Sequence, residues 1–296
     1  MPSSEMQSDD PGGFVMAPVD PEVTPVPGGT ATRSRFSELD AKGSALKLLR
    51  IALFYLALLA LWQLLYSLHV WSPYLLPSPS DVWHSFVDYV DNGLIQKAVR
   101  ASLQRLLIGY AISIVVGLII GMACGSNKYV DETLGSVVLG MQSLPSITWL
   151  PLAILWFGLN QNAIIFVTFM GSVGAIAISA RAGVQAIPPL YRRAAATMGA
   201  NRYQSVRYVL LPAMVPSMAQ GLKLGWSFAW RSLMAAELIF VTTGLGHLLN
   251  LGRDLNNMSL VLAIMFVIVA IGLAVDRIFF ARVEAWVQER WGLQTA

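Results

Sequence analysis

The chain has 296 residues, of which 55% are hydrophobic and only 12% charged, and its mean hydropathy is +0.59. Soluble domains carry about 25% charged residues, so this composition excludes an ordinary soluble protein and predicts an integral membrane protein. The net charge of +3 is therefore no indication of nucleic-acid binding, and we expect none. A single cysteine, Cys124, excludes an intrachain disulfide and a multi-cysteine metal site.

The N-terminal segment predicts a disordered tail over residues 1–44, followed by a transmembrane domain over residues 45–296. Six prolines occur by position 27, together with several glycines and scattered acids, and no hydrophobic periodicity is present. The first apolar run begins near Leu46 rather than near Met1. We therefore expect no cleaved signal peptide.

Hydrophobic windows predict about six transmembrane helices, because an apolar stretch of about 20 residues crosses the bilayer. They cover residues 46–66, 103–123, 134–157, 162–180, 222–243 and 259–280. Basic residues precede the first span, and five arginines without any acid occur between residues 181 and 207. Since positive charge is retained in the cytoplasm during insertion, we expect this loop and both termini there.

A turn and N-cap signal at residues 76–81 separates the first two spans and is followed by apolar residues at helical spacing. It predicts a short amphipathic helix at the outer interface. Trp71, Tyr74 and Trp83 fit an aromatic belt at headgroup level better than a ligand site.

The second span carries Gly109, Gly117, Gly121 and Gly125 on one helical face, which predicts a seam of close helix packing. The sequence contains neither a P-loop nor a strand-linked G-x-G-x-x-G motif. Any nucleotide that powers this protein must therefore be bound by another chain.

The third span contains two prolines, Pro145 and Pro151, so its helix is expected to be kinked or broken within the membrane. Freed carbonyls and hydroxyls at that depth suit the lining of a translocation path. A kink that neighbouring helices satisfy explains the prolines equally well. The candidate path residues here are Gln142, Ser143, Ser146 and Thr148.

The fifth span adds two charged path candidates, Arg231 and Glu237, which are costly in a membrane and need partners. Six residues separate them, so they do not share a helical face and each is expected to meet a partner elsewhere. Arg231 is equally consistent with contacting an anionic solute and with a structural pair. For Glu237 the structural alternative is favoured.

The basic loop between the fourth and fifth spans predicts two short helices with a break between them. Pro189 suits a first helical position, and Gly199 suits a left-handed C-terminal stop. Asn201 suits an N-cap with Gln204 three residues later. Taken alone, this segment is also consistent with a basic loop that merely obeys membrane topology.

The spacing of Ala194-Ala195, Gly199 and Val209-x-Leu211-Pro212 closely resembles the EAA loop of permease subunits in binding-protein-dependent ABC importers. Arg193 stands where that family usually has glutamate, so any salt bridge of that glutamate is lost here. Other segments resemble the nitrate, sulfonate, taurine and bicarbonate branch, over residues 46–292 in all. They are Leu76-Pro-Ser-Pro, the glycine-rich span, Trp230-Arg231 with Ala236-Glu237, and Gly244-Leu-Gly246.

The resemblance implies an all-α type I ABC importer permease in the bacterial cytoplasmic membrane, without catalysis of its own. It implies a permease homodimer or pair, two cytoplasmic ABC ATPases that hold ATP and Mg, and an extracytoplasmic solute-binding protein. The chain itself would bind no cofactor. The loop over about residues 187–212 would couple to the ATPases. The residues implied in coupling are Leu190, Tyr191, Arg192, Arg193, Ala194, Ala195, Gly199, Ala200, Arg202, Gln204, Leu211 and Pro212.

Two other functions would require features that differ from those of an importer. An ion-coupled secondary transporter or channel for a small organic solute predicts inverted repeats or midplane acids, and no such repeat is visible. An intramembrane enzyme needs a catalytic constellation, whereas His69, His84 and His247 all fall at outer edges or loops. The branch and Arg231 favour a small anion, without choosing among nitrate, bicarbonate, sulfonates and taurine.

Overall fold

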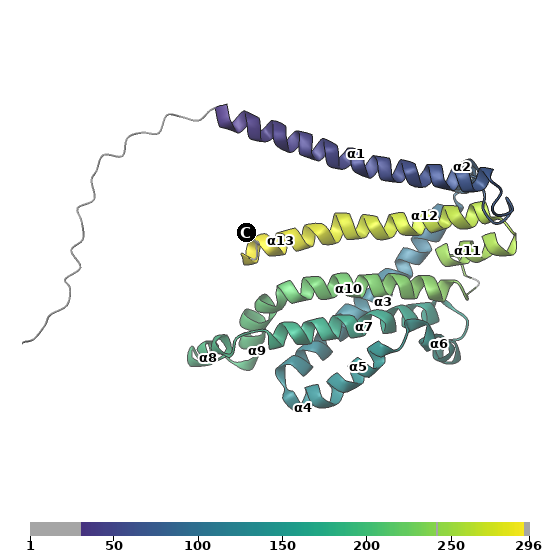
Figure 1. The fold of residues 1–296 in the computed structure, drawn as a ribbon. Coiled ribbons are helices and arrows are strands. Elements are labelled where there is room, and N and C mark those ends of the chain that lie inside the picture. The colour runs from purple at the N-terminus through teal and green to yellow at the C-terminus, as the bar shows by residue number, and fades with distance from the viewer. Residues whose placement is uncertain (1–30, 241, 293–296) are drawn as a thin grey trace, which may run out of the picture. The chain divides into compact units, whose positions relative to one another are not determined.

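The computed structural model describes residues 31–240 and 242–292, and over those residues its regular secondary structure is entirely helical (Figure 1). The chain divides into two compact units, residues 1–58 and 59–296, and all the candidate functional residues belong to the second. The first 30 residues of the predicted tail lie outside the described part. Helix α1, Ala31–Ser67, begins inside the segment that was predicted as tail, since no proline interrupts the chain between Pro27 and Pro73.

The helix predicted between the first two spans is α2, Pro79–Asp91. Ser78 caps it, because its Oγ accepts from the Asp81 N–H at 3.1 Å while the Asp81 carboxylate accepts from the Ser78 N–H at 3.2 Å. Val82 is buried, whereas the acidic face of α2 is exposed. The sequence therefore predicted both the start and the amphipathic character of this helix.

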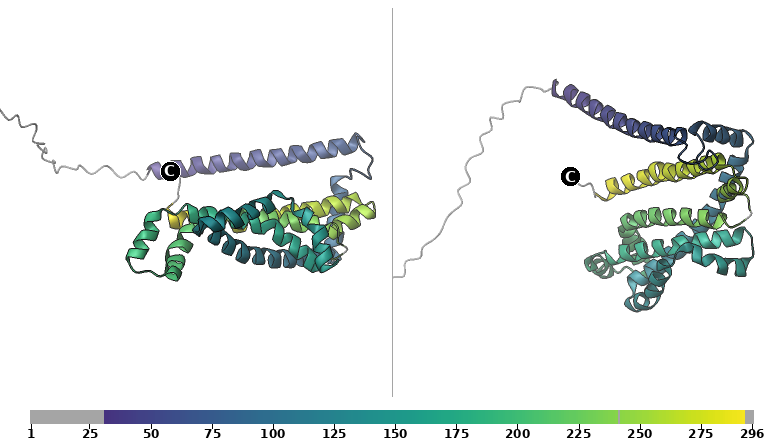
Figure 2. Two further views of the ribbon diagram at one scale, coloured as in Figure 1. Left: turned by 90° about the horizontal axis from the view of Figure 1, so that it is seen from below. Right: turned by 45° about the vertical axis from the view of Figure 1, so that its right-hand side comes forward.

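Three long helices form the centre of the second unit: α3, Leu94–Ser126; α7, Gln161–Gln185; and α10, Leu211–Glu237. α7 packs along both others, and Figure 2 shows α7 and α10 side by side in further views. The glycine seam is confirmed on α3. A β-carbon on Gly121 would overlap Ala180 of α7, and one on Gly125 would overlap Val184. Small residues thus allow the two backbones to approach closely.

The third predicted span is broken, as its prolines indicated, and it is not one straight helix over residues 134–157. It consists of α4, Lys128–Val130; η1, Asp131–Gly135; α5, Ser136–Ser143; η2, Ser146–Trp149; and α6, Leu150–Phe157. The halves on either side of Leu144 and Pro145 are bent by 102°. Pro145 lacks an N–H and disfavours helical geometry in the residue before it, so the helix ends at Ser143.

Four helices over the described residues are long and apolar enough to cross a membrane, or five if the bent pair counts as one span. The remaining predicted span, residues 222–243, falls largely on α10, which is not among these helices and carries Lys223 and Arg231. The 27 residues of α10 still span about 40 Å.

The last helices are α11, Leu245–Asp254; α12, Met258–Ala274; η4, Val275–Phe280; and α13, Ala281–Trp291. The run from Met258 to Trp291 is continuous and extends beyond the predicted 259–280. It is tied to α10 by Lys223, whose Nζ lies 3.1 Å from Glu284 Oε2, and by Trp291, whose indole donates to the Pro212 carbonyl at 3.1 Å.

Candidate functional site

The loop between α7 and α10 folds as two short helices, α8, Pro189–Thr197, and α9, Arg202–Ser205. Gly199 ends α8 with a φ of +79°, a left-handed conformation that costs glycine little. Its N–H donates to the Ala196 carbonyl and the Ala200 N–H donates to the Ala195 carbonyl, both at 3.0 Å. This is the Schellman arrangement, which satisfies carbonyls that a helix end leaves free. The predicted stop at Gly199 is confirmed.

The start of α9 is fixed by a reciprocal capping box between Asn201 and Gln204. The Gln204 N–H donates to Asn201 Oδ1 at 2.8 Å, and the Asn201 N–H donates to Gln204 Oε1 at 2.9 Å. α9 then runs through η3, Val206–Leu210, into α10. The loop is thus a defined helix–turn–helix whose conformation is set by its own sequence.

The loop is anchored at its base and exposed at its tip. Ile187, Leu210 and Met214 pack with Ala180 and Val184 in a small buried cluster below α8. Beyond that cluster the loop exposes large apolar and aromatic side chains, namely Leu190, Tyr191, Met198, Tyr203 and Tyr208, at 59% to 86% of their surface. Exposed apolar side chains gathered on one ordered loop are typical of protein-binding surfaces.

The residues expected to couple to an ATPase therefore lie on α8, on α9, on the turn between them and at the start of α10. Ala195 is buried against the base, whereas Arg193, Ala194, Gly199, Gln204 and Pro212 are exposed, and Ala200 and Leu211 are partly buried. The side chains of Arg192 and Arg202 lie outside the described part.

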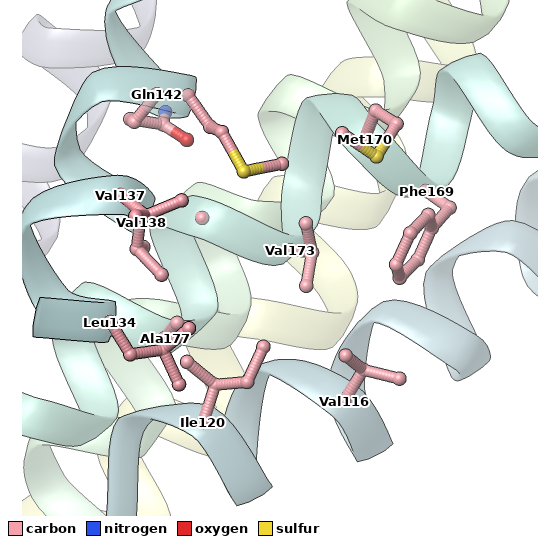
Figure 3. A pocket seen from close by; sticks show the side chains of 12 residues that line it. Val116, Ile120, Leu134, Val137, Val138, Gln142, Phe169, Met170, Val173 and Ala177 are labelled. Carbon is pink, nitrogen blue, oxygen red and sulfur yellow. The ribbon is translucent and has the colours of Figure 1, made fainter. Parts of the chain in front are cut away.

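The polar residues of the broken span lie on both sides of the bend. Gln142, at the end of α5, borders a cavity of about 120 Å³ between α3, α5 and α7 (Figure 3). The exposed hydroxyls beside the break are satisfied locally: Ser143 donates to the Gly140 carbonyl and Thr148 to the Pro145 carbonyl. Ser146 lies close to Gly171 of α7. These side chains surround the break without forming one cluster.

The cavity beside Gln142 is almost entirely apolar. Figure 3 shows Val116 and Ile120 from α3, Val137 and Val138 from α5, and Phe169 and Val173 from α7 around it. It offers shape and dispersion contacts but no charged group that would hold an anion.

Glu237 is wholly buried in a polar cluster that joins α3, α10 and α11. Its carboxylate accepts from Arg105 Nη1 at 2.8 Å, from Ser102 Oγ at 2.7 Å and from the Gly246 N–H at 3.1 Å. Ser102 Oγ accepts in turn from the Leu245 N–H at 2.9 Å. The carboxylate is thus enclosed by hydrogen-bond donors and does not face an open path. This environment agrees with the structural role that was favoured for Glu237 over a role in the path.

Two glycines allow the start of α11 to approach the Glu237 side chain closely. A β-carbon on Gly244 would lie 2.5 to 2.7 Å from the Glu237 carboxyl atoms, and one on Gly246 would overlap the Glu237 side chain and backbone. At the start of α11, the Gly246 N–H therefore reaches the carboxylate directly, and the Leu245 N–H reaches it through Ser102. Sequence analysis did not identify the partner of Glu237. Arg105 was visible as a charge inside a predicted span, which was the one available signal.

Arg231, by contrast, is exposed on α10, where its guanidinium lies 5.9 Å from the centre of the Phe228 ring. Among the described residues no carboxylate pairs with it. Arg231 is therefore separate from the Glu237 cluster, and its charge remains available to a ligand or to another chain.

Residues 113–286 match the model of the family described as binding-protein-dependent transport system inner membrane component. The taurine transport system permease protein TauC of Escherichia coli is 30% identical over 225 residues, which cover 74% of this chain and 82% of TauC. The nitrate import permease protein NrtB of Synechocystis is 30% identical, covering 81% and 90%. The bicarbonate transport system permease protein CmpB of Synechococcus elongatus is 29% identical, covering 67% and 71%.

Solved structures share the fold. A chain of the MetNI methionine ABC transporter, in an inward-facing conformation, aligns with a TM-score of 0.57 at 20% identity, over 66% of this chain and 96% of that one. An amino acid ABC transporter aligns with a TM-score of 0.54 at 20% identity, over 69% and 98%.

Proposed function

Because the chain belongs to the family of binding-protein-dependent transport system inner membrane components and is an ABC importer permease, we propose that it forms the translocation path for a small anion. Its relatives of the taurine, nitrate and bicarbonate systems confirm the branch indicated by the sequence. Family membership also favours the importer over an ion-coupled secondary transporter.

The proposed power source is a pair of separate ATPases that hold ATP and Mg and dock on α8. The main support for this proposal is the loop itself: the Gly199 stop and the Asn201 cap fix the turn between α8 and α9, and its tip exposes Leu190, Tyr191 and Met198. A rigid helix with an apolar face can enter a cleft in a partner and move with it. The sequence contains no phosphate-binding motif, which fits a permease that is powered by other subunits.

The proposed assembly contains two permease copies, two ATPases and an external solute-binding protein. In this arrangement the α8–α9 loop and both termini face the cytoplasm, in accord with the arginines between residues 181 and 207. ATP binding would favour one orientation of the path and hydrolysis would restore the other, since each ligand must prefer one state.

The proposed solute carries an anionic oxygen group, as taurine, nitrate and bicarbonate do. Arg231 is the cation on α10 that fits such a group, because its planar guanidinium donates two parallel hydrogen bonds. Glu237 is not assigned to solute binding, because Arg105 and Ser102 already occupy its carboxylate.

Copurification in mild detergent tests the docking surface. We expect an ATPase to copurify with the unmodified chain and to be largely lost from the Tyr191→Ser variant, because Tyr191 exposes 59% of its surface at the tip of the loop. Tyr129, 80% exposed on α4, provides the matched control, and its Tyr129→Ser variant should retain the ATPase. Equal recovery from both variants would remove α8 as the docking helix.

A further inference from the structure

An ion pair joins the end of α7, which leads to α8, to the segment that immediately precedes α5. Arg181 of α7 donates from Nη2 to Asp131 Oδ2 at 2.8 Å, and Gln185 Nε2 donates to the same oxygen at 3.0 Å. Asp131 is the first residue of η1, which leads directly into α5. The helix that leads into the predicted coupling loop is therefore in direct polar contact with the segment that leads into the helix of Gln142 and Ser143.

This pair differs from the ordinary surface pair nearby. The Arg181 and Asp131 side chains are 28% and 16% exposed, whereas those of Lys128 and Glu132 are 85% and 59% exposed and lie 3.7 Å apart. Exposed pairs are screened and contribute little to stability. A half-buried pair with a second donor holds its geometry more firmly, because solvent competes with it less.

On the α7 side, the connection to α8 is short and stiff. Only residues 186–188 separate the two helices, and they are fixed by the buried Ile187 and by Pro188 before the first residue of α8. The Ala186 N–H also continues the hydrogen bonding of α7 to the Ala182 carbonyl at 2.9 Å. A movement of α8 is therefore transferred to the last turn of α7, where Arg181 and Gln185 lie.

On the Asp131 side of the ion pair, α5 is lightly packed within this chain and is therefore able to move with η1. None of its residues is buried, the helix ends at the break beside Pro145, and the apolar cavity of about 120 Å³ separates part of it from α3 and α7 (Figure 3). An element with few buried contacts moves at low cost in free energy. Gly135 permits the local fold, since a β-carbon there would lie 2.8 Å from Asp131 Oδ1.

We propose that Asp131 is a positioning residue, which transmits the movement of α8 to α5 through Arg181 and Gln185. This inference rests on the proposed function, because it requires an ATPase that moves α8. It assigns to the pair the task of shifting the polar end of α5, where Gln142 and Ser143 lie beside the break, as the ATPases close and open.

The test uses the complete complex of this chain with its ATPase in nanodiscs, with an environment-sensitive fluorophore on a single added cysteine. Leu139→Cys reports on α5 and Ala196→Cys on α8, both exposed positions, while the native Cys124 is buried at 3% exposure. With Asp131 intact, we expect ATP plus vanadate to shift the emission of both labels. In the Asp131→Asn background, the label at position 196 should respond fully and the label at 139 should lose at least half of its shift.

Three further variants sharpen this comparison. Asp131→Glu keeps the charge and should restore most of the shift at position 139, whereas Glu132→Gln, which removes the exposed pair next to it, should change neither signal. Gln185→Ala removes one of the two donors and should weaken the shift at position 139 by less than Asp131→Asn does. It provides the same test if the Asp131→Asn chain does not assemble.

The outcomes separate the two proposals. A full shift at position 139 in the Asp131→Asn or the Gln185→Ala complex, with position 196 responding, overturns the role of Asp131 and leaves the importer intact. A label at position 196 that ignores ATP in the otherwise unmodified chain overturns the docking of an ATPase on α8, and the inference falls with it.

Discussion

At the scale of single residues, the two charges of α10 have opposite environments. Glu237 is wholly buried and its oxygens accept from three donors, whereas Arg231 is exposed beside Phe228. A charge that is already paired has little capacity for a solute. An unpaired charge in a membrane helix requires a partner of opposite charge. A transported anion would supply one during each transport cycle.

The Arg231→Gln variant should lower uptake of the solute about tenfold or more, because a hydrogen bond to a charged group contributes about 1.5–3 kcal/mol. The measurement is uptake of taurine, nitrate and bicarbonate into proteoliposomes that contain the whole importer. Arg231→Lys should retain part of the activity, since it keeps the charge but not the planar pair of donors.

Arg253 provides the control for this prediction. It is an exposed arginine on α11 that pairs with Asp254, so Arg253→Gln should leave uptake unchanged. Normal uptake by an assembled Arg231→Gln complex would contradict the anion contact.

At the scale of elements, the Glu237 cluster determines where α11 lies. The Glu237 carboxylate accepts from Arg105 and Ser102 of α3 and from the Gly246 N–H of α11, while the Leu245 N–H of α11 donates to Ser102 Oγ, so three helices meet at one buried charge. The glycines at 244 and 246 are required because any side chain there would collide with Glu237. The same charge that is costly to bury thus specifies the packing around it.

Removing either partner of this cluster alone should be strongly destabilising. Arg105→Gln or Glu237→Gln alone leaves an uncompensated buried charge and should destabilise the chain by about 3–5 kcal/mol. The double variant should lose less than the sum of the two. Unfolding of the purified chain in a detergent titration measures the three differences.

The exposed pair Lys128 and Glu132 serves as the reference cycle, with an expected coupling of about 0.5 kcal/mol or less. Additive losses at Arg105 and Glu237 would show that the two residues act independently.

At the scale of the whole molecule, the arrangement of helices gives one end of the second unit a distinct character. The α8–α9 loop carries the exposed apolar tip and the arginines, whereas the hairpin between α6 and α7, around Gly158, is uncharged. That asymmetry is what membrane insertion uses to orient a chain, so the loop should lie in the cytoplasm.

Labelling of intact cells with a membrane-impermeant maleimide tests this orientation. Leu159→Cys, in the uncharged hairpin, should react from outside, whereas Met198→Cys, in the loop, should react only after the cells are permeabilised. Both positions are more than 70% exposed, and the native Cys124 is buried. Reaction of Met198→Cys in intact cells would place the loop outside and rule out its coupling to cytoplasmic ATPases.

Sequence reasoning predicted best those features that depend on residues within about one turn of each other. The stop at Gly199, the cap of Asn201 and Gln204, the capping box at Ser78 and the break before Pro145 all use hydrogen bonds or steric clashes between near neighbours. Apolar run length likewise predicted the membrane, and the spacing of the loop predicted the family. Each of these signals is contained in a short stretch of chain.

The tertiary structure alone decided which distant residues meet. Arg105 and Glu237 are 132 residues apart, and Asp131 and Arg181 are 50 apart, so no local pattern records either pairing. The 102° bend and the length of the run from Met258 to Trp291 also depend on what each segment packs against. Charged residues pair only when they are close in space, and the packing of α3, α7 and α10 brings these distant residues together.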